Sequence, residues 1–235
     1  MGYLTTGLKN ECYGCTACAA ICPKKAITMG TDSEGFLYPV VNDDFCIKCN
    51  LCKKVCSAEK DVEKVKTQQS VATLYNDEAV LLKSASGGAF KALLESVDRD
   101  TVVYGVCWES RSVAVFDKAS IEDAFEKFRK SKYVQAEVRN TYSSVKNDLD
   151  NGNKVLFVGT PCQASGLKEF LRKPYDNLIL TDLICHGVPS SKVLEKQFEC
   201  WDSKNDKAKS IQFRHKEQKN NTWNSKYALV EFESG

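Results

Sequence analysis

The chain has 235 residues, of which 43% are hydrophobic and 27% charged, a composition typical of a folded, water-soluble protein that excludes intrinsic disorder. Its formal net charge of +2 gives no electrostatic reason to expect binding to nucleic acid or to acidic membrane surfaces. No apolar run approaches the roughly 20 residues of a membrane-spanning helix, and the N-terminus lacks the apolar core of a secretory signal. We therefore expect one ordinary domain plus a small module, with no nucleic-acid partner and no membrane span.

Cysteine usage is the most unusual feature of this composition, with 12 cysteines in the chain. Most of them precede Ser57, in two runs whose gaps are only two or three residues, and four are spread through the remainder. Disulfides of a secreted domain are not usually concentrated in this way, whereas metal thiolates in a reducing compartment are. We expect a cytoplasmic, metal-binding protein.

The two cysteine runs are copies of one pattern, C-x2-C-x2-C-x3-C. A 4Fe-4S cube needs four thiolates in a tetrahedral arrangement, and this pattern supplies three from one tight loop and the fourth from the distant run. The predicted ligands are therefore Cys12, Cys15, Cys18 and Cys56 for one cluster, and Cys46, Cys49, Cys52 and Cys22 for the other. The sequence predicts two 4Fe-4S clusters, each closed by the other half of the repeat.

A pair of zinc sites is the alternative for these cysteines, because C-x2-C also binds zinc. Zinc sites usually take two cysteines from each of two knuckles and rarely show this spacing twice. Small residues suit a position against sulfide, and Ala17, Ala19 and Ala20 provide them. Pro23 stands where the bacterial ferredoxin pattern places a proline, and Ser57 replaces the second proline. These features favour the iron–sulfur interpretation.

Between the two runs, "AITMGTDSEGFLYPVVNDD" predicts two short strands around a polar turn, and "SAEKDVEKVKTQQS" predicts a linker. From residue 70 onward, apolar strands alternate with helices of about 10–15 residues. In chain order these are strand "SVATLYN", helix "AFKALLESVDRD" after a Gly-Gly turn, strands "TVVYGVCW" and "SVAVF", helices "SIEDAFEKFRKS" and "EVRNTYSSVKNDLDNG", strand "KVLFVG", helix "PCQASGLKEFLRK", strand "NLILTDLIC", helix "PSSKVLEKQFECWDSK", and strands "SIQFRH" and "KYALVEFESG". Ser120 with Asp123 begins one helix in the manner of a capping box. The alternation indicates βαβ units and a mostly parallel sheet.

The segments "KSASGGAF", "VVYGVCW", "FRKSKYVQAEV", "KVLFVGTPCQASGL" and "LICHGVPS" follow the doubled cysteine module in this order. With them, the chain from Cys12 onward resembles the beta subunits of coenzyme F420-reducing hydrogenase and the related formate dehydrogenases. The resemblance implies a bacterial-type ferredoxin domain over 1–60, a linker over 61–69, and a beta-subunit domain whose N-terminal and C-terminal parts are 70–150 and 151–235. Because the chain stops after a hairpin arm, we expect the last part to be incomplete. The expected fold class is an α+β ferredoxin-like two-cluster module followed by a mixed α/β flavoprotein domain.

This resemblance implies an oxidoreductase that passes electrons between the 4Fe-4S clusters and FAD, with hydride exchange to the deazaflavin coenzyme F420 or a similar carrier. Clusters carry single electrons and hydride carriers take two, and a flavin connects them because it is stable in one- and two-electron forms. One alternative is an electron-transfer subunit of a larger complex, without its own substrate site, that serves a redox partner protein. Another is a cluster-bearing accessory protein in glycan (polysaccharide) biosynthesis.

Several residues are predicted to bind the flavin. Ser86, Gly87 and Gly88 precede a helix, where a backbone without side chains approaches a phosphate easily, although a plain turn is the alternative. Lys132 and Tyr133 lie between two helices, with an exposed loop as the alternative. Further predicted contacts come from the segments after two strands, and they are Thr160, Pro161, Cys162, Asp182, Cys185 and His186. For Asp182, which ends a predicted parallel strand, the alternative is a turn cap.

Cys162 has three possible roles. Pro161 suits the first turn of a helix, whose dipole favours a thiolate at Cys162 and lowers the pKa of its thiol. Since Cys162 and Cys185 both follow strand ends, they are expected at one edge of the sheet, where a third 4Fe-4S cluster with Cys107 or a flavin pocket with His186 would form. A nucleophilic pair of Cys162 and His186 is the least favoured role. Two other side chains, Cys200 and His215, are assigned no function. Cys200, like Cys107, is interpreted as a core residue, and His215 as a surface residue.

Overall fold

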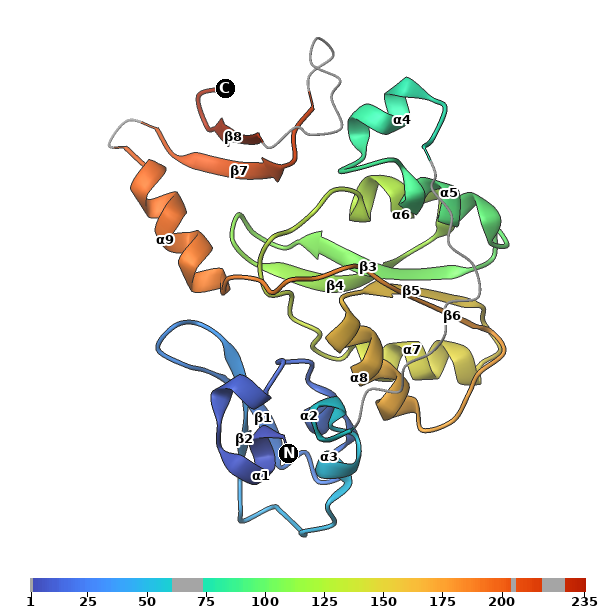
Figure 1. Ribbon diagram of the computed structural model, residues 1–235, viewed down its shortest axis with the longest axis vertical. Helices are drawn as coiled ribbons and strands as arrows, with labels where there is room; N and C mark the ends of the chain where they lie inside the picture. Colours follow the sequence, from blue (N-terminus) through green and yellow to red (C-terminus); the bar gives the residue numbers. More distant parts are fainter. Residues whose placement is uncertain (1, 61–73, 204–205, 217–226) are drawn as a thin grey trace.

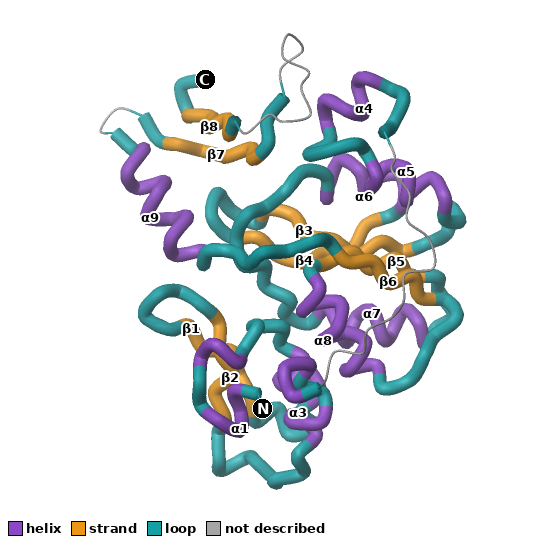
Figure 2. Tube along the Cα trace, in the orientation of Figure 1, coloured by secondary structure: helices purple, strands orange, loops and turns teal. Residues whose placement is uncertain are grey.

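A computed structural model describes residues 2–60, 74–203, 206–216 and 227–235. A small N-terminal module lies below a four-stranded sheet that carries helices on both faces, and a two-stranded sheet lies near the C-terminus (Figures 1 and 2). No helix in these ranges is long and apolar enough to cross a membrane. The predicted linker, 61–69, falls outside the described residues, and the predicted domain boundaries stay predictions.

The N-terminal module is built from short elements around one hairpin. They are α1 (Tyr3–Thr6), η1 (Lys9–Glu11), α2 (Ala17–Ile21), β1 (Ile27–Thr31), β2 (Leu37–Val41), α3 (Leu51–Lys54) and η2 (Ser57–Glu59). Strands β1 and β2 pair in the antiparallel sense, with Met29 opposite Pro39, as the sequence predicts. The internal repeat is visible in the backbone, because α2 and α3 each follow a residue in the left-handed region, Thr16 with φ 64° and Asn50 with φ 59°.

The larger part of the chain contains the four-stranded sheet in the order β4-β3-β5-β6. Its strands are β3 (Val102–Trp108), β4 (Ala114–Ala119), β5 (Val155–Gly159) and β6 (Leu178–Asp182), and its helices are α4 (Glu78–Lys83), α5 (Ala89–Ser96), α6 (Ile121–Phe128), α7 (Thr141–Asp150), α8 (Pro161–Leu171) and α9 (Ser191–Trp201). β3 pairs with β5, and β5 with β6, in the parallel sense, whereas β3 and β4 are antiparallel. The C-terminal sheet pairs β7 (Ala208–Phe213) with β8 (Ala228–Phe232). The mixed α/β class is therefore confirmed.

Local capping signals account for several helix starts. Ser120 Oγ accepts a hydrogen bond from the Asp123 backbone N–H at 3.2 Å, as predicted. At the start of α8, Thr160 N donates to Gln163 Oε1 at 2.9 Å, and Pro161 occupies the first turn. Such caps satisfy N–H groups that have no partner within the helix. They place the start of α8 directly at the carboxyl end of β5.

Three predicted elements differ from the structure. The strand expected over 70–76 falls partly outside the described residues, and 74–76 are not in a strand. The helix expected from Glu137 begins only at Thr141, because Glu137 pairs with β4 instead and Arg139 has a left-handed φ of 48°. Strand β6 ends at Asp182, so that Leu183 leaves the sheet after donating its N–H to the Gly159 carbonyl.

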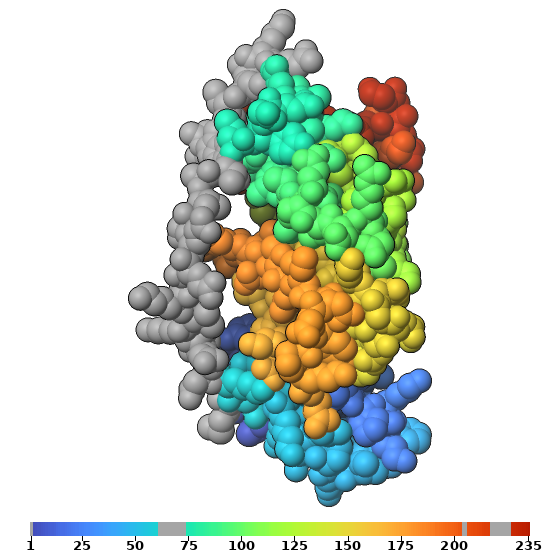
Figure 3. Space-filling view, turned by 90° about the vertical axis from the view of Figure 1, so that its right-hand side faces the viewer, coloured from blue at the N-terminus to red at the C-terminus, as the bar shows by residue number. Residues whose placement is uncertain are grey.

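Helices cover the sheet on both faces, and the N-terminal module packs beneath the face that carries α7 and α8 (Figure 1). One core cluster lies between the sheet and α5 and α6, and it includes Val103 and Leu156. A second lies between the sheet and α7 and α8, and it includes Ala17 and Val55 of the N-terminal module. The space-filling view shows the module, blue to cyan, against the yellow and orange segments that include α8 (Figure 3). The module therefore shares a core with the α/β domain.

Candidate metal centre and cofactor site

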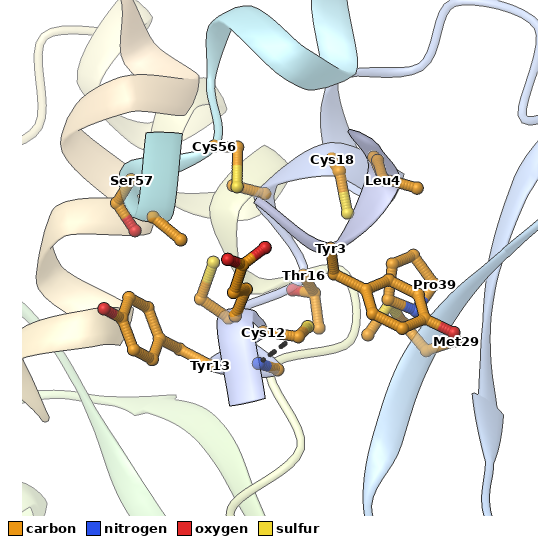
Figure 4. A pocket seen from close by; sticks show the side chains of 15 residues that line it. Tyr3, Leu4, Cys12, Tyr13, Thr16, Cys18, Met29, Pro39, Cys56 and Ser57 are labelled. Carbon is orange, nitrogen blue, oxygen red and sulfur yellow. Dashed lines mark hydrogen bonds between the residues drawn. The ribbon is translucent and has the colours of Figure 1, made fainter. Parts of the chain in front are cut away.

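Four of the predicted ligands line one cavity in the N-terminal module. The cavity has a volume of about 30 Å³, and Cys12, Cys15, Cys18 and Cys56 contribute to its walls (Figure 4). Ala17 also lines it and is fully buried. None of the second predicted set of ligands contributes to these walls. The cavity therefore joins the first cysteine run to the last cysteine of the second run, as the crossed assignment predicts.

The local backbone brings these sulfur atoms together. Cys12 follows η1, and its Sγ accepts a hydrogen bond from the Gly14 N–H at 3.4 Å. The left-handed turn before α2 reverses the chain between Cys15 and Cys18. Cys56 arrives from the end of α3, which packs against α2. Residues far apart in sequence thus meet because the two copies of the repeat pack on each other.

Burial governs the electrostatics of these thiols. It raises the pKa of the Cys15 thiol to about 11, and it also raises the pKa values of the Cys12 and Cys18 thiols. The neighbouring thiols, including Cys56, act in the same direction, because each disfavours a second negative charge nearby. Buried thiolates so close together need a compensating positive charge, which a coordinated metal supplies.

The donor set fits a 4Fe-4S cluster, since it consists of soft sulfur ligands with a small alanine beside them. Within the described ranges, no three His, Cys, Asp or Glu side chains converge tightly enough to hold a single metal ion. The ligand roles of the individual cysteines stay predictions.

The second set of predicted ligands lies nearer the solvent. Cys46 and Cys49 are electrostatic neighbours of Cys52, whose pKa is raised mainly by burial. Cys49 is exposed, and Cys22 Sγ accepts a hydrogen bond from the Ala26 N–H at 3.3 Å. The two predicted cluster positions therefore differ in their exposure to solvent.

The first cavity adjoins the α/β domain. Gly166 of α8 approaches Cys15 so closely that a Cβ at this glycine would lie 3.2 Å from the Cys15 Sγ. The same Cβ would lie 2.7 Å from the Tyr142 hydroxyl oxygen of α7. Cys162, in the first turn of α8, lies close enough to Cys12 and Cys15 that its charge raises the pKa of both thiols. The beginning of α8 thus connects the cavity to the carboxyl edge of the sheet.

This carboxyl edge brings together the predicted flavin-binding residues that follow β5 and β6. Thr160 Oγ1 lies 3.2 Å from the Cys162 Sγ, and Cys185 is an electrostatic neighbour of Cys162. Asp182 ends β6 opposite Gly159. The remaining members of this group, Pro161, Cys185 and His186, are exposed, as is Asp182. The geometry places these residues together without assigning a role to any of them.

The expectation of an activated thiol at Cys162 is wrong. Burial is the largest influence and raises the pKa of the Cys162 thiol, although the Thr160 hydroxyl acts in the opposite direction. The start of a helix favours a thiolate, but desolvation disfavours any charge, and here desolvation prevails.

The predicted Gly-Gly segment forms a tight turn before α5. Gly88 has a φ of 84°, and a Cβ there would lie 2.7 Å from the Tyr75 Cβ. The Gly87 carbonyl accepts a hydrogen bond from the Tyr75 N–H at 2.8 Å, and Lys216 Nζ donates to the Ser86 carbonyl at 2.8 Å. The left-handed turn and the close approach of Tyr75 already account for glycine at position 88. Its contact with a flavin stays a prediction.

Lys132 points back onto the end of α6. Its Nζ donates to the carbonyls of Phe128 and Arg129, at 2.9 Å each, and to that of Lys130 at 3.4 Å. Burial lowers the pKa of the Lys132 ammonium to about 8. Lys132 therefore satisfies carbonyl groups that a helix end leaves without partners. Tyr133 is exposed.

The register of the sheet relates Lys132 to the carboxyl edge. Tyr104 of β3 lies opposite Phe157 of β5, so Cys107, three residues further along, is level with Thr160. Cys107 lies close enough to Lys132 for its charge to raise the pKa of that ammonium group. Its side chain is partly buried against the core cluster of α5 and α6. The loop after α6 and the ends of β3, β5 and β6 therefore lie at one edge of the sheet.

Two residues expected to be without function have different surroundings from those predicted. Cys200 is exposed, although its neighbour Phe198 is fully buried, because the two point to different sides of α9. His215 is only partly exposed rather than at the surface, and its Nδ1 atom is buried.

Sequence reasoning overlooked two residues. Gln135 Oε1 accepts a hydrogen bond from the Leu37 N–H at 3.2 Å and so ties the α/β domain to the hairpin of the N-terminal module. Thr16 lines the cavity with a buried hydroxyl. The position of Thr16 inside a cysteine run was the available signal, whereas no local signal identifies Gln135.

Two stretches of the chain match known protein families. Residues 152–234 match the family model for the C terminus of the beta subunit in coenzyme F420 hydrogenase/dehydrogenase, and residues 11–60 match that of a 4Fe-4S dicluster domain. A comparison with curated proteins gives no match. A solved structure of the xenon-derivatised F420-reducing NiFe hydrogenase complex from Methanosarcina barkeri aligns with 23% identity and a TM-score of 0.45, over 60% of this chain and 52% of that one. The chain thus spans about half the length of the solved chain it matches.

Proposed function

Because the chain belongs to the coenzyme F420 hydrogenase/dehydrogenase beta-subunit family and has an N-terminal 4Fe-4S dicluster domain, we propose that it passes electrons between two 4Fe-4S clusters and FAD. The observation that carries this proposal is the cavity shared by Cys12, Cys15, Cys18 and Cys56, which adjoins α8. The clusters supply single-electron transfer, and FAD supplies the conversion between one- and two-electron steps.

The two cluster positions suit a path for electrons from the protein surface to the carboxyl edge of the sheet. Phe45 and Ile47, beside the second cysteine run, are 62% and 56% exposed, and Cys49 is exposed as well. The first cavity is lined by Cys56 of this run, and Cys15 in its wall packs against Gly166 of α8. We therefore place the exchange with a redox partner protein at the second cluster and the exchange with FAD at the first.

The proposed FAD site is the carboxyl edge of β3, β5 and β6. Open parallel sheets bind ligands at this edge, and the Thr160–Cys162 turn lies there next to the first cavity. Deazaflavin coenzyme F420, or a similar hydride carrier, is the substrate we propose. The residues of this edge would hold the flavin.

The test of the cofactor assignment is an anaerobic measurement of iron, acid-labile sulfide and flavin per chain in the full-length protein. We expect about eight iron atoms, about eight sulfides and about one FAD. About twelve iron atoms would support a third cluster at Cys162 and Cys185 instead. Zinc in place of iron and sulfide would overturn the cluster assignment.

The substrate is tested separately by oxidation of reduced F420 with a viologen dye as electron acceptor. Turnover that requires bound FAD is the expected result. Rapid exchange of electrons between the clusters and the dye, without FAD and without F420 oxidation, would instead indicate an electron-transfer subunit that has no substrate site of its own.

A further inference from the structure

The hydroxyl group of Thr16 is buried in the first cysteine cavity without a partner. Thr16 is 6% exposed, and its Oγ1 makes no hydrogen bond with any group in the described parts of the chain. The side chain lines the cavity together with Cys12, Cys18 and Cys56 (Figure 4). A buried hydroxyl without a partner is unfavourable, so its presence calls for an acceptor in the cavity.

The backbone at this position makes threonine an unexpected choice. Thr16 has a φ of 64°, in the left-handed region that β-branched residues rarely adopt and that glycine adopts without strain. Thr16 precedes α2, but its side chain makes no capping hydrogen bond to that helix. Neither the backbone nor the helix cap therefore explains a threonine here.

The second copy of the repeat provides an internal comparison. Asn50 occupies the equivalent position with almost the same backbone, at φ 59°, and it is exposed. Asparagine tolerates the left-handed region better than threonine does. The repeat thus requires the backbone conformation in both copies, whereas only the buried copy carries a strained residue with a hydroxyl directed into a cavity of thiols.

We propose that the Thr16 hydroxyl donates a hydrogen bond to a sulfur atom of the first cluster and thereby raises the reduction potential of that cluster. The inference rests on the proposed clusters. Hydrogen bonds to cluster sulfur atoms stabilise the additional negative charge of the reduced state, and they are a recognised determinant of potential. Burial disfavours the same charge, so the hydroxyl compensates in part for the position of the first cluster beneath α8.

The test compares Thr16→Val and Thr16→Ser in the full-length, cluster-loaded protein by redox titration followed by electron paramagnetic resonance. Valine keeps the branched shape and removes the hydroxyl, whereas serine keeps the hydroxyl. For Thr16→Val we expect one of the two cluster reduction potentials to fall by up to about 59 mV. This shift corresponds to a tenfold change in the equilibrium constant of a one-electron reduction. Thr16→Ser should stay near the wild type, and Asn50→Ala should leave that potential unchanged.

A second measurement reports the proton itself. Electron–nuclear double resonance of the reduced cluster in H2O and D2O should show an exchangeable proton coupling that is lost in Thr16→Val and retained in Thr16→Ser. Should Thr16→Val fail to fold, Thr16→Gly removes the hydroxyl and relieves the left-handed strain at the same time. Equal potentials in wild type, Thr16→Val and Thr16→Gly would overturn the inference, as would an equal fall in Thr16→Ser. Absence of iron and sulfide from the wild type would instead overturn the proposed clusters.

Discussion

The crossed pairing of the two cysteine runs can be tested with two double variants. Cys56 lines the same cavity as Cys12, whereas Cys22 does not line it, and its Sγ accepts a hydrogen bond from the Ala26 N–H. Cys12→Ala/Cys56→Ala therefore removes two ligands from one cluster and leaves the other intact. Cys12→Ala/Cys22→Ala removes one ligand from each cluster. The two variants lose the same number of cysteines, so any difference between them reports the pairing.

The expected magnitude follows from the number of intact ligand sets. Cys12→Ala/Cys56→Ala should retain about four of about eight iron atoms, and Cys12→Ala/Cys22→Ala should lose most of the iron from both positions. Iron and acid-labile sulfide are measured after anaerobic reconstitution, and the remaining cluster is identified by electron paramagnetic resonance. Cys200→Ser is the control, since Cys200 is exposed on α9, and its iron content should equal that of the wild type. The opposite ranking of the two double variants would refute the crossed assignment.

Three further predictions concern the contacts around these sites. Gly166→Ala introduces a Cβ 2.7 Å from the Tyr142 hydroxyl oxygen and 3.2 Å from the Cys15 Sγ. We expect the free energy of unfolding, measured with denaturant, to fall by about 1–3 kcal/mol, and the first cluster to lose iron. Because the pKa of Lys132 is lowered to about 8 in the folded protein, the unfolded chain binds more protons above that pH, and stability should rise with pH from about 8 to about 10.5, by up to about 3 kcal/mol. Lys132→Met should lack this rise in unfolding experiments at matched pH values. Gly88→Val, which combines a φ of 84° with a contact to Tyr75, should lower the FAD content without changing the iron content, and unchanged FAD would remove Gly88 from the proposed flavin site.

Features that depend on neighbouring residues were predictable from the sequence. The hairpin of β1 and β2 and the cap at Ser120 follow from short-range signals, namely alternation around a polar turn and an acceptor three residues before a free N–H. The cavity at Cys12 and Cys56 was also predictable, because ligand spacing encodes a long-range contact in a local pattern. The match to a 4Fe-4S dicluster domain confirms the iron–sulfur character of the module, whereas the ligand role of each cysteine stays a prediction.

Features that depend on packing were not predictable. The local signal at Cys162, the start of a helix, indicates a lowered pKa, but the thiol lies beneath packed elements and desolvation raises it. Glu137 has a helical pattern around it, yet its backbone pairs with β4 and delays α7 to Thr141. Lys132 turns toward the end of α6 because the carbonyls there need donors. In each case a partner distant in sequence or a terminal carbonyl outweighs the local preference.

The two copies of the repeat also show how one spacing serves two environments. At equivalent positions, the first copy has Ala20 where the second has Lys54. Ala20 packs against the core shared with α7 and α8, whereas Lys54 is exposed. Thr16 and Asn50 differ in the same sense, buried in one copy and exposed in the other. Because the cysteine spacing is identical in both copies, substitutions of this kind between the cysteines distinguish the copy that faces the α/β domain from the copy that faces solvent. The residues between the cysteines, and not the cysteines themselves, therefore determine which of the two proposed clusters lies next to the α/β domain.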